Sequence, residues 1–317
     1  MERRRVLIIT YYWPPSGGVG VQRWLHFAKN LKLLGWEPIV YTPENPQFDI
    51  KDEGLVNMVG EIEVIKRPIW EPFTFFHKIT GNKNKENVKQ GLVLEKSKKT
   101  WKDDLIVWVR GNMFIPDPRV FWVRPSMRYL LKEVRRKEIG TIITTGPPHS
   151  MHLIGLALKN RIPDLKWLAD FRDPWSDWDV LPKLRVTRLA MARHKKLERL
   201  VLRNCDQPVT VSYRLATSLA EKSSTKSEVK VLPNGISDDK AVLKQSVASE
   251  DQFIIGYFGM LNEIRDPEGL WSELEKLCDQ NDEFAKKLSI RLGGIVAQSI
   301  QDRLLASPQL GSKVVFL

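Results

Sequence analysis

The amino-acid sequence predicts an α/β protein with two Rossmann-like, doubly wound domains, the second of them incomplete. Three observations support this prediction. Short apolar runs alternate with amphipathic segments, a pattern typical of parallel strands joined by helices. A glycine turn follows the first strand of each half, at residues 17–20 and at Gly259. The last predicted strand, residues 313–317, reaches the final residue of the sequence, so we expect the second sheet to lack some of its strands.

The first strand is a continuous apolar run that starts at Val6 and stops at Pro14-Pro15, because proline cannot donate to a β-ladder. A Gly-Gly-Val-Gly turn, residues 17–20, then precedes a helix that ends near Gly35. Open backbone N–H groups and the helix dipole point at the same spot, which predicts an anion-binding site. A turn required only for close packing is the alternative. The spacing differs from the dinucleotide fingerprint G-x-G-x-x-G, which argues against a dehydrogenase.

The rest of the first domain repeats this alternation of strand and helix. Strands are predicted at 36–42, 61–66, 141–145, 165–169, 208–211 and 229–232, and helices at 126–137, 151–160, 183–204 and 213–222. We expect one parallel sheet over residues 1–235, with the carboxyl ends of its strands meeting at one edge. Ligands of open α/β sheets lie at that edge, so the turns that follow strands there are candidates for the functional site.

Two of these turns carry polar side chains. One, Gly-Pro-Pro-His-Ser, contains His149, and the next strand delivers Asp170 and Asp173. An imidazole and two carboxylates at this edge can hydrogen-bond an acceptor hydroxyl or a donor sugar, so these three are the candidate catalytic residues. The alternatives are helix capping by His149 or Ser150, and an ion pair with Arg172 for one of the aspartates.

Residues 70–118 interrupt the pattern and are predicted to be an insertion, because the segment is too long for a simple loop. Tryptophans and lysines lie close together in it, among them Lys96, Lys98, Lys99, Trp101, Lys102 and Trp108. Such a mixture suits a membrane interface, where the ring lies at headgroup depth and the ammonium group meets lipid phosphate. A helical insertion packed on its own domain is the alternative.

A polar linker is predicted at 236–251 and a second domain at 252–317. This domain begins with a buried strand, 253–259, and its first helix is expected to have Asp266 as cap and Pro267 at the first helical position. Its remaining elements are predicted at 288–292 (strand), 298–305 (helix) and 313–317 (strand).

Charge is distributed unevenly along the chain. Residues 1–210 contain 37 Lys and Arg against 23 Asp and Glu, whereas residues 211–317 contain 13 against 15. A basic first half indicates an anionic partner, such as a phosphorylated ligand or an anionic lipid surface, unless the excess serves only solubility. No recognition-helix or RNA-binding motif is found, so no nucleic-acid partner is expected.

The two cysteines, Cys205 and Cys278, form no metal-binding or disulfide pattern, which suits a reducing compartment. The apolar run near the N-terminus is too short for a signal peptide, and no segment is long enough to span a bilayer. We therefore expect a cytoplasmic protein.

Several motifs together resemble one known family. Three of them are similar to the retaining glycosyltransferases of family 4, which have the GT-B fold: Tyr11-Tyr12-Trp13-Pro14-Pro15-x-Gly-Gly, Leu232-Pro233-Asn234-Gly235-Ile236 and Tyr257-Phe258-Gly259. Two more are similar to a bacterial branch that makes surface polysaccharide: Thr145-Gly146-Pro147-Pro148-His149-Ser150 and Asp170-Phe171-Arg172-Asp173-Pro174-Trp175. The similarity extends over the whole chain and is least diagnostic in the predicted insertion.

The resemblance implies transfer of a sugar from a nucleotide-diphosphate sugar to a glycan or lipid-linked acceptor, with retention and without a metal or other cofactor. It implies an acceptor pocket in the first domain, a donor pocket mainly in the second, and work at the anionic inner face of the plasma membrane. The implied substrate-binding residues are Gly17, Gly18, Gly20, Arg172, Asn234, Gly259 and Arg265. Met260 stands where the family often has arginine, which leaves Arg265 as the strong cation of that loop.

The family's glutamate-rich donor-binding motif would lie beyond Leu317, so the chain resembles a fragment, and the resemblance does not imply that it is active alone. A non-catalytic protein that binds sugar nucleotide or lipid, and a sugar-nucleotide epimerase of the same fold, are the alternatives. The sugar, the nucleotide base and the acceptor do not follow from the sequence.

Overall fold

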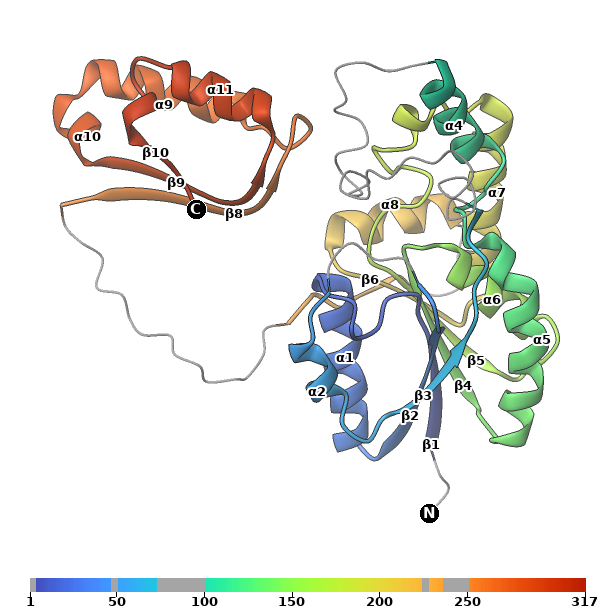
Figure 1. Cartoon of the computed structure of the whole chain (residues 1–317). Helices are drawn as coiled ribbons and strands as arrows, with labels where there is room; N and C mark the ends of the chain where they lie inside the picture. Colours follow the sequence, from blue (N-terminus) through green and yellow to red (C-terminus); the bar gives the residue numbers. More distant parts are fainter. Residues whose placement is uncertain (1–3, 47–50, 73–100, 224–227, 236–250) are drawn as a thin grey trace. The chain divides into compact units, whose positions relative to one another are not determined.

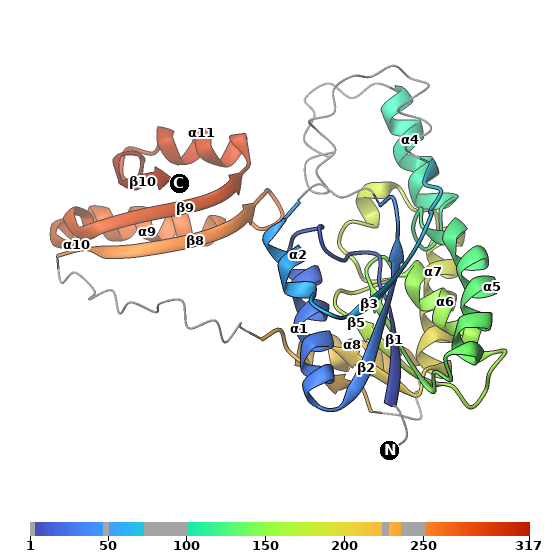
Figure 2. The same cartoon turned by 60° about the horizontal axis from the view of Figure 1, so that its bottom comes forward.

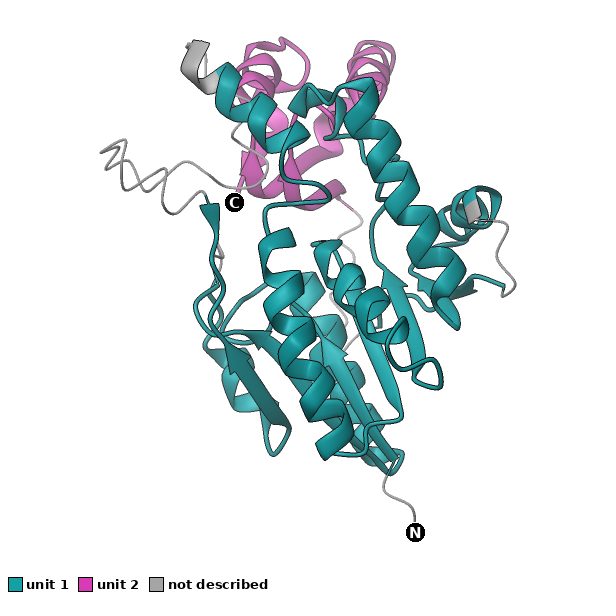
Figure 3. Ribbon diagram, turned by 90° about the vertical axis from the view of Figure 1, so that its right-hand side faces the viewer, with its two compact units in different colours: residues 1–237 teal, residues 238–317 magenta. Residues whose placement is uncertain are grey.

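In the computed structural model the described residues are 4–46, 51–72, 101–223, 228–235 and 251–317 (Figure 1). The chain has two compact units, residues 1–237 and 238–317, which have different colours in Figure 3. Each unit has its own parallel sheet and its own apolar core.

In the described part of unit 1, seven strands form one sheet. They are β1 (Arg4–Ile9), β2 (Trp36–Pro43), β3 (Glu63–Arg67), β4 (Thr141–Gly146), β5 (Lys166–Phe171), β6 (Gln207–Thr210) and β7 (Lys230–Val231). The helices are α1 (Val19–Leu33), α2 (Gly54–Val59), α4 (Trp101–Asn112), α5 (Val120–Arg136), α6 (Ser150–Lys159), α7 (Arg188–Asn204) and α8 (Tyr213–Ser223), with a 3-10 turn η1 (Pro182–Leu184) before α7.

All neighbouring strands of this sheet run parallel, in the order β3-β2-β1-β4-β5-β6-β7. The chain winds outward from β1 to β3 and returns to β4 on the other side of β1. Right-handed crossovers therefore put α1 and α2 on one face and α5 and α6 on the other, as Figures 1 and 2 show. A sheet wound in this way has a crevice where the winding reverses, at the carboxyl ends of β1 and β4.

Strand β1 is covered on both faces, which explains its continuous apolar sequence. Leu7, Ile8 and Ile9 have no exposed surface. Leu7 and Ile9 belong to the core beneath α5, α6, α7 and α8, whereas Ile8 belongs to the core beneath α1 and α2. This is the alternation of side chains that a pleated strand requires. Burying each of them contributes about 1.5–3 kcal/mol, so β1 holds both helical layers together.

Two helices of unit 1 differ from their expected ranges. Helix α5 starts at Val120 instead of Ser126 and contains Pro125, at which the sequence predicts a boundary because proline removes a helical hydrogen bond. Helix α7 starts later than expected, because the Thr187 hydroxyl caps it by accepting from the Ala190 N–H at 3.3 Å. The short helix α2 was not expected from the sequence.

Helix α4 lies within the predicted insertion and is fixed to the loop before α7. The Asn112 side chain donates to the Arg185 carbonyl (3.1 Å) and accepts from the Thr187 N–H (2.8 Å). The Arg185 guanidinium also forms an ion pair with Asp104 (2.8 Å). This part of the insertion is therefore a packed helix. None of the helices in the described ranges combines the length and the apolar character needed to cross a bilayer.

Unit 2 has a parallel sheet in the order β10-β9-β8. Its elements are β8 (Phe253–Leu261), α9 (Glu268–Gln280), α10 (Asp282–Lys287), β9 (Leu288–Val296), α11 (Gln298–Ala306), a 3-10 turn η2 (Gly311–Lys313) and β10 (Val314–Phe316). Its core joins α9 and α11 to the sheet through Trp271, Leu274 and Ile300, which meet Ile290 and Leu292 of β9.

The expected boundaries in unit 2 need three corrections. Strand β9 continues to Val296 and does not end at Leu292. Strand β8 continues to Leu261 and does not end at Gly259, because it pairs with β9 over its whole length. Gly259 lies opposite Gly294, and a Cβ on Gly294 would come within 2.5 Å of the Gly259 carbonyl oxygen, so this close approach requires glycine. Asp266 does not cap α9, whose N-cap is Pro267; its carboxylate accepts from the Trp271 indole (2.8 Å) instead.

Candidate functional site

The carboxyl ends of β1, β4 and β5 bring together three segments that the sequence indicates. The glycine turn follows β1, the turn with His149 follows β4, and Asp170 lies near the end of β5. Arg172 links these segments, because its Nη2 donates to the Pro147 carbonyl and its Nη1 lies against Gly20. The expected meeting of the three segments at one edge of the sheet is therefore confirmed by these contacts.

Helix α1 begins at Val19, inside the glycine segment 17–20, and in the described residues no side chain caps it. The N-cap residue, Gly18, has φ of 101°, a conformation that favours glycine, and it is exposed. The first turn of the helix carries no acidic residue. The positive end of the helix dipole and its first N–H groups are thus open to an anion.

Arg172 adds a full positive charge at the same place. A Cβ on Gly20 would lie 1.8 Å from Nη1 of Arg172, so the guanidinium occupies this position only because residue 20 is glycine. The Nε of Arg172 is buried and has no hydrogen-bond partner among the described residues. Burial lowers the pKa of Arg172, and Asp170 and Asp173 oppose that shift, but an arginine still remains protonated. A cation and a helix N-terminus therefore lie side by side at the carboxyl edge of the sheet, an arrangement suited to phosphate.

Asp170 is fully buried and is surrounded by donors. It forms an ion pair with Arg23 (2.9 Å) and accepts from the Trp24 indole (2.7 Å) and the Thr145 hydroxyl (2.9 Å). The expected ion pair with Arg172 is wrong for Asp170, because the first turns of α1 point Arg23 at the end of β5. These bonds fix α1 to the sheet, and Asp170 would have to exchange one of them to bind a substrate.

Arg23 also connects this cluster to the segment that follows β7. Its Nη1 donates to the Pro233 carbonyl and to the Asn234 side-chain oxygen, both at 3.1 Å. Asn234, a predicted substrate-binding residue, is therefore brought to the same edge of the sheet. Sequence reasoning missed Arg23; its position one helical turn after Gly20 was the available signal.

His149 is buried and stacks on Trp175, with ring centroids 4.8 Å apart and planes inclined by 5°. Burial lowers the pKa of His149 to about 3, so the imidazole is neutral at physiological pH. Its Nδ1 is also buried, without a partner among the described residues. In this position the ring is packed against Phe171 and Trp175 and is shielded from solvent, which does not support its predicted catalytic role.

The capping role proposed for His149 or Ser150 is wrong. No side chain of either residue caps α6; instead Asp117 reaches it from the loop before α5. The Asp117 carboxylate accepts from the Ser150 N–H (2.9 Å) and the Ser150 hydroxyl (2.8 Å). Burial raises the pKa of Asp117. A carboxylate distant in sequence satisfies the helix N-terminus, which local patterns do not reveal. Asp173, by contrast, is exposed at the same edge.

A second polar cluster lies beside β1 and was not predicted. The Tyr11 hydroxyl bonds the Glu71 carboxylate (3.0 Å), which also forms an ion pair with Arg119 (2.9 Å). The Arg119 guanidinium lies 4.6 Å from the centre of the Tyr11 ring. Burial and the charge of Arg119 lower the pKa of the nearby Arg110. Glu71 and Arg119 stand at opposite ends of the predicted insertion, so only the fold brings them together.

Comparison with known proteins gives a fold. Neither a protein-family model nor a curated protein sequence matches this chain. A glycosyltransferase from Rickettsia africae ESF-5 superposes with a TM-score of 0.52 at 14% identity, over 100% of this chain and 68% of its own. The lipopolysaccharide outer core galactosyltransferase WaaB gives 0.51 at 9% identity, over 98% and 67%.

An E. coli structure described as trehalose-6-phosphate bound with UDP-2-fluoro glucose gives a TM-score of 0.53 at 11% identity, over 99% of this chain and 73% of its own. This chain has a parallel sheet in each of its two units, and the superpositions cover nearly all of it. The fold is GT-B. At such low identities the likeness concerns the fold alone.

Within this GT-B fold, unit 2 carries the other two predicted binding residues. Gly259 lies inside β8, and the exposed Arg265 lies in the turn after that strand, where its N–H donates to the Asn262 carbonyl (2.9 Å). Both are therefore near the carboxyl end of β8, the edge at which open α/β sheets bind ligands.

Two expectations concern residues that the structure does not describe or groups that it does not contain. Lys96, Lys98 and Lys99 lie outside the described residues, so the membrane role of the insertion stays a prediction. In the described ranges, no three or more His, Cys, Asp or Glu side chains are grouped so that they could hold a metal ion. The expected independence from metal also stays a prediction.

Proposed function

We propose that this chain is a glycosyltransferase, or its two-unit catalytic core, that moves a sugar from a nucleotide-diphosphate sugar to an acceptor. The observation that supports this most is the pairing of the uncapped α1 N-terminus with the guanidinium of Arg172 at the carboxyl edge of the sheet of unit 1. Phosphate oxygens match both groups, because backbone N–H donors and a charged guanidinium each form strong bonds to anionic oxygen.

The chemistry requires few protein groups. The diphosphate must be held and its growing negative charge neutralised as the bond to the sugar breaks, and the acceptor hydroxyl must be oriented. In our proposal Gly17, Gly18, Gly20 and Arg172 of unit 1 bind phosphate oxygens, and Gly259 and Arg265 are the residues that unit 2 offers to a nucleotide sugar. Asp173, exposed beside Arg172, orients the acceptor hydroxyl.

The stereochemistry, the metal independence and the acceptor in our proposal rest on the family resemblance of the motifs. The proposal comprises transfer with retention, without a metal, to a glycan or lipid-linked acceptor in the synthesis of cell-surface polysaccharide. The basic composition of residues 1–210 supports an enzyme that works in the cytoplasm at the anionic inner face of the membrane.

Calorimetric titration with inorganic pyrophosphate, UDP and GDP tests the phosphate site. We expect R172Q to weaken binding about 10- to 100-fold, which corresponds to about 1.5–3 kcal/mol for a hydrogen bond to a charged group. G20A should have the same effect, because the new methyl group displaces the guanidinium. R193Q, which removes an exposed arginine of α7, is the matched control and should bind normally.

The reaction itself is tested by incubating the protein with UDP- and GDP-sugars and membrane extracts, and by following nucleoside-diphosphate release together with the anomeric configuration of the product by NMR. Release of a nucleoside diphosphate with retained configuration supports the proposal. A protein that binds none of the three anions, or whose R172Q variant binds them equally well, contradicts it.

A further inference from the structure

The outer surface of α5 is basic along its whole length. Arg124, Arg128, Lys132 and Arg135 are exposed and recur at intervals of three or four residues, so they form one stripe on the helix. The acidic residue of this helix, Glu133, is buried and pairs with Arg136, so it does not neutralise the stripe. Figure 2 shows α5 on the outside of the helical layer.

A groove between α5 and α6 opens beside this stripe. Its volume is about 330 Å³, and it is lined by Val123, Arg124, Met127, Arg128, Ala157 and Arg161. Three arginines thus surround a floor of three apolar side chains. A purely ionic partner would leave that floor in contact with water, whereas a molecule with an anionic head and a hydrocarbon part would match both components.

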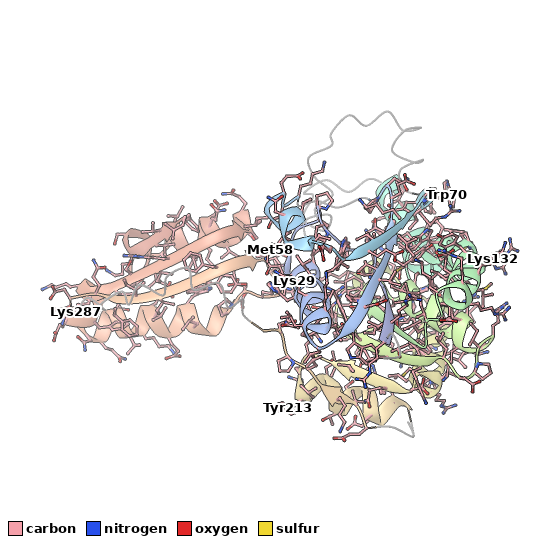
Figure 4. The ribbon with its side chains drawn as sticks, turned by 90° about the horizontal axis from the view of Figure 1, so that it is seen from below. Lys29, Met58, Trp70, Lys132, Tyr213 and Lys287 are labelled. Carbon is pink, nitrogen blue, oxygen red and sulfur yellow. The ribbon has the colours of Figure 1, made fainter. Side chains whose placement is uncertain are left out.

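The N-terminal end of the stripe is aromatic. Phe121 precedes Arg124 by three residues and is 43% exposed, and Trp70, which contacts it with ring centroids 4.9 Å apart, is 57% exposed. Tryptophan next to basic side chains is the composition of protein surfaces at the headgroup level of a bilayer. Figure 4 shows Trp70 and Lys132 on the same side of unit 1, and Lys29 on the opposite side.

We propose that the outer face of α5, with Trp70 at its tip and the α5–α6 groove beside it, is the surface by which unit 1 docks on a bilayer of acidic phospholipid. The arginines bind headgroup phosphates, and Phe121 and Trp70 enter the headgroup layer. This inference rests on the membrane part of the proposed function. It assigns membrane binding to the α5 surface and not to the lysines of residues 96–102. Double-stranded nucleic acid, held through its phosphates, would use the same charges but not the apolar floor and tip.

Co-sedimentation with vesicles at low salt tests this surface. The wild-type protein should bind vesicles of phosphatidylglycerol and phosphatidylcholine but not vesicles of phosphatidylcholine alone. Reversal of the three groove arginines (R124E, R128E and R161E together) should lower the partition coefficient at least about 100-fold, since each basic residue near an anionic surface contributes about fivefold. F121S should lower it about tenfold at unchanged charge.

The matched control reverses three exposed lysines on other elements, K29E, K51E and K276E, and so changes the net charge equally. It should retain most of the binding. If it loses binding as completely as the arginine variant, only net charge matters and the docking surface is refuted. Competition by double-stranded RNA for the same arginines, with no effect of F121S, would also refute it in favour of a nucleic-acid site.

A further variant separates this inference from the proposed function. Reversal of Lys96, Lys98, Lys99 and Lys102 should leave vesicle binding largely intact. If it abolishes binding while the groove variant binds normally, the α5 surface is wrong and the membrane part of the proposed function stands. If the wild-type protein ignores acidic vesicles, both membrane statements fail, although sugar transfer, measured separately, is unaffected.

Discussion

Strand β1 of unit 1 and strand β8 of unit 2 are both apolar segments, and yet their surroundings differ. Leu7 and Ile9 of β1 are fully buried, whereas Ile254 and Phe258 of β8 are 44% and 73% exposed. β1 has a parallel partner on each side and helices on both faces, but β8 pairs only with β9 in the described residues. The apolar sequence specifies a strand in both cases, and elements distant in the chain decide how much of it is buried.

The two units also differ in where they keep their charges. Unit 1 buries an ion pair, Arg23 with Asp170, next to its candidate site. The ion pairs described in unit 2, such as Glu283 with Lys287, each have at least one exposed partner. A substitution at a buried position of unit 1 should therefore lower the free energy of unfolding more than a substitution at an exposed position of unit 2. The following experiments test this difference.

The largest effect is expected for D170A. Removing the carboxylate leaves the buried guanidinium of Arg23 without its counter-charge, which should lower the free energy of unfolding by about 3–5 kcal/mol. Differential scanning calorimetry should show the loss in the transition of unit 1. D164A, which changes an exposed aspartate, should stay within about 0.5 kcal/mol of the wild type. Equal stability of both variants would mean that the buried pair does not stabilise the unit.

The next largest effect is expected for a buried side chain of β1, and an exposed side chain of β8 provides the comparison. L7A removes a fully buried side chain and should destabilise unit 1 by about 3 kcal/mol, through lost burial and the cavity that remains. I254A removes a side chain that is nearly half exposed and should cost less than about 1 kcal/mol. Chemical denaturation measures both. If I254A is as costly as L7A, the exposed face of β8 is covered in solution.

Acidification should also act on unit 1 in particular, because the histidines of the sequence all lie in its first 194 residues. Burial lowers the pKa of His149 to about 3 and that of His194 to about 4, whereas an unfolded histidine titrates at about 6.5. The unfolded chain thus binds more protons between these values, so this stabilisation is complete above about pH 6.5 and is lost as the pH falls toward 4.

By about pH 5 the loss should reach about 1–2 kcal/mol for each buried histidine. H194N is the informative variant, because the asparagine oxygen can replace Nδ1 as acceptor for the Trp175 indole, which donates to it at 3.1 Å, without titrating. Its free energy of unfolding, measured from about pH 7 to pH 5, should fall less steeply than that of the wild type. An unchanged slope would mean that His194 takes no part in the pH dependence.

The smallest effects are expected for exposed ion pairs, and there the two units should agree. K32A removes the partner of Glu61 in unit 1, and K287A removes that of Glu283 in unit 2; all four side chains are well exposed. Each substitution should change the free energy of unfolding by less than about 0.5 kcal/mol and should matter less in high salt. A loss above about 1 kcal/mol in either unit would place that pair in a network that stabilises the fold.

The sequence by itself determined the parts of this protein that depend on neighbouring residues. The alternation of apolar runs with helices predicted the parallel sheets, and the segment 17–20 predicted the uncapped helix N-terminus that the structure has. The pattern also predicted that the turns after β4 and β5 meet this segment. These predictions succeed because strand period, helix caps and glycine turns are local properties, and because parallel strands share one carboxyl edge.

Only the tertiary structure decided which side chains meet across long stretches of sequence. Asp170 pairs with Arg23 and not with the nearby Arg172, and Asp117 caps a helix in place of His149 or Ser150. The same holds for burial, since β8 has as apolar a sequence as β1 and is largely exposed. Such pairings depend on distances between atoms of separate elements, and desolvation depends on all the elements that cover a group. A local sequence pattern contains neither kind of information.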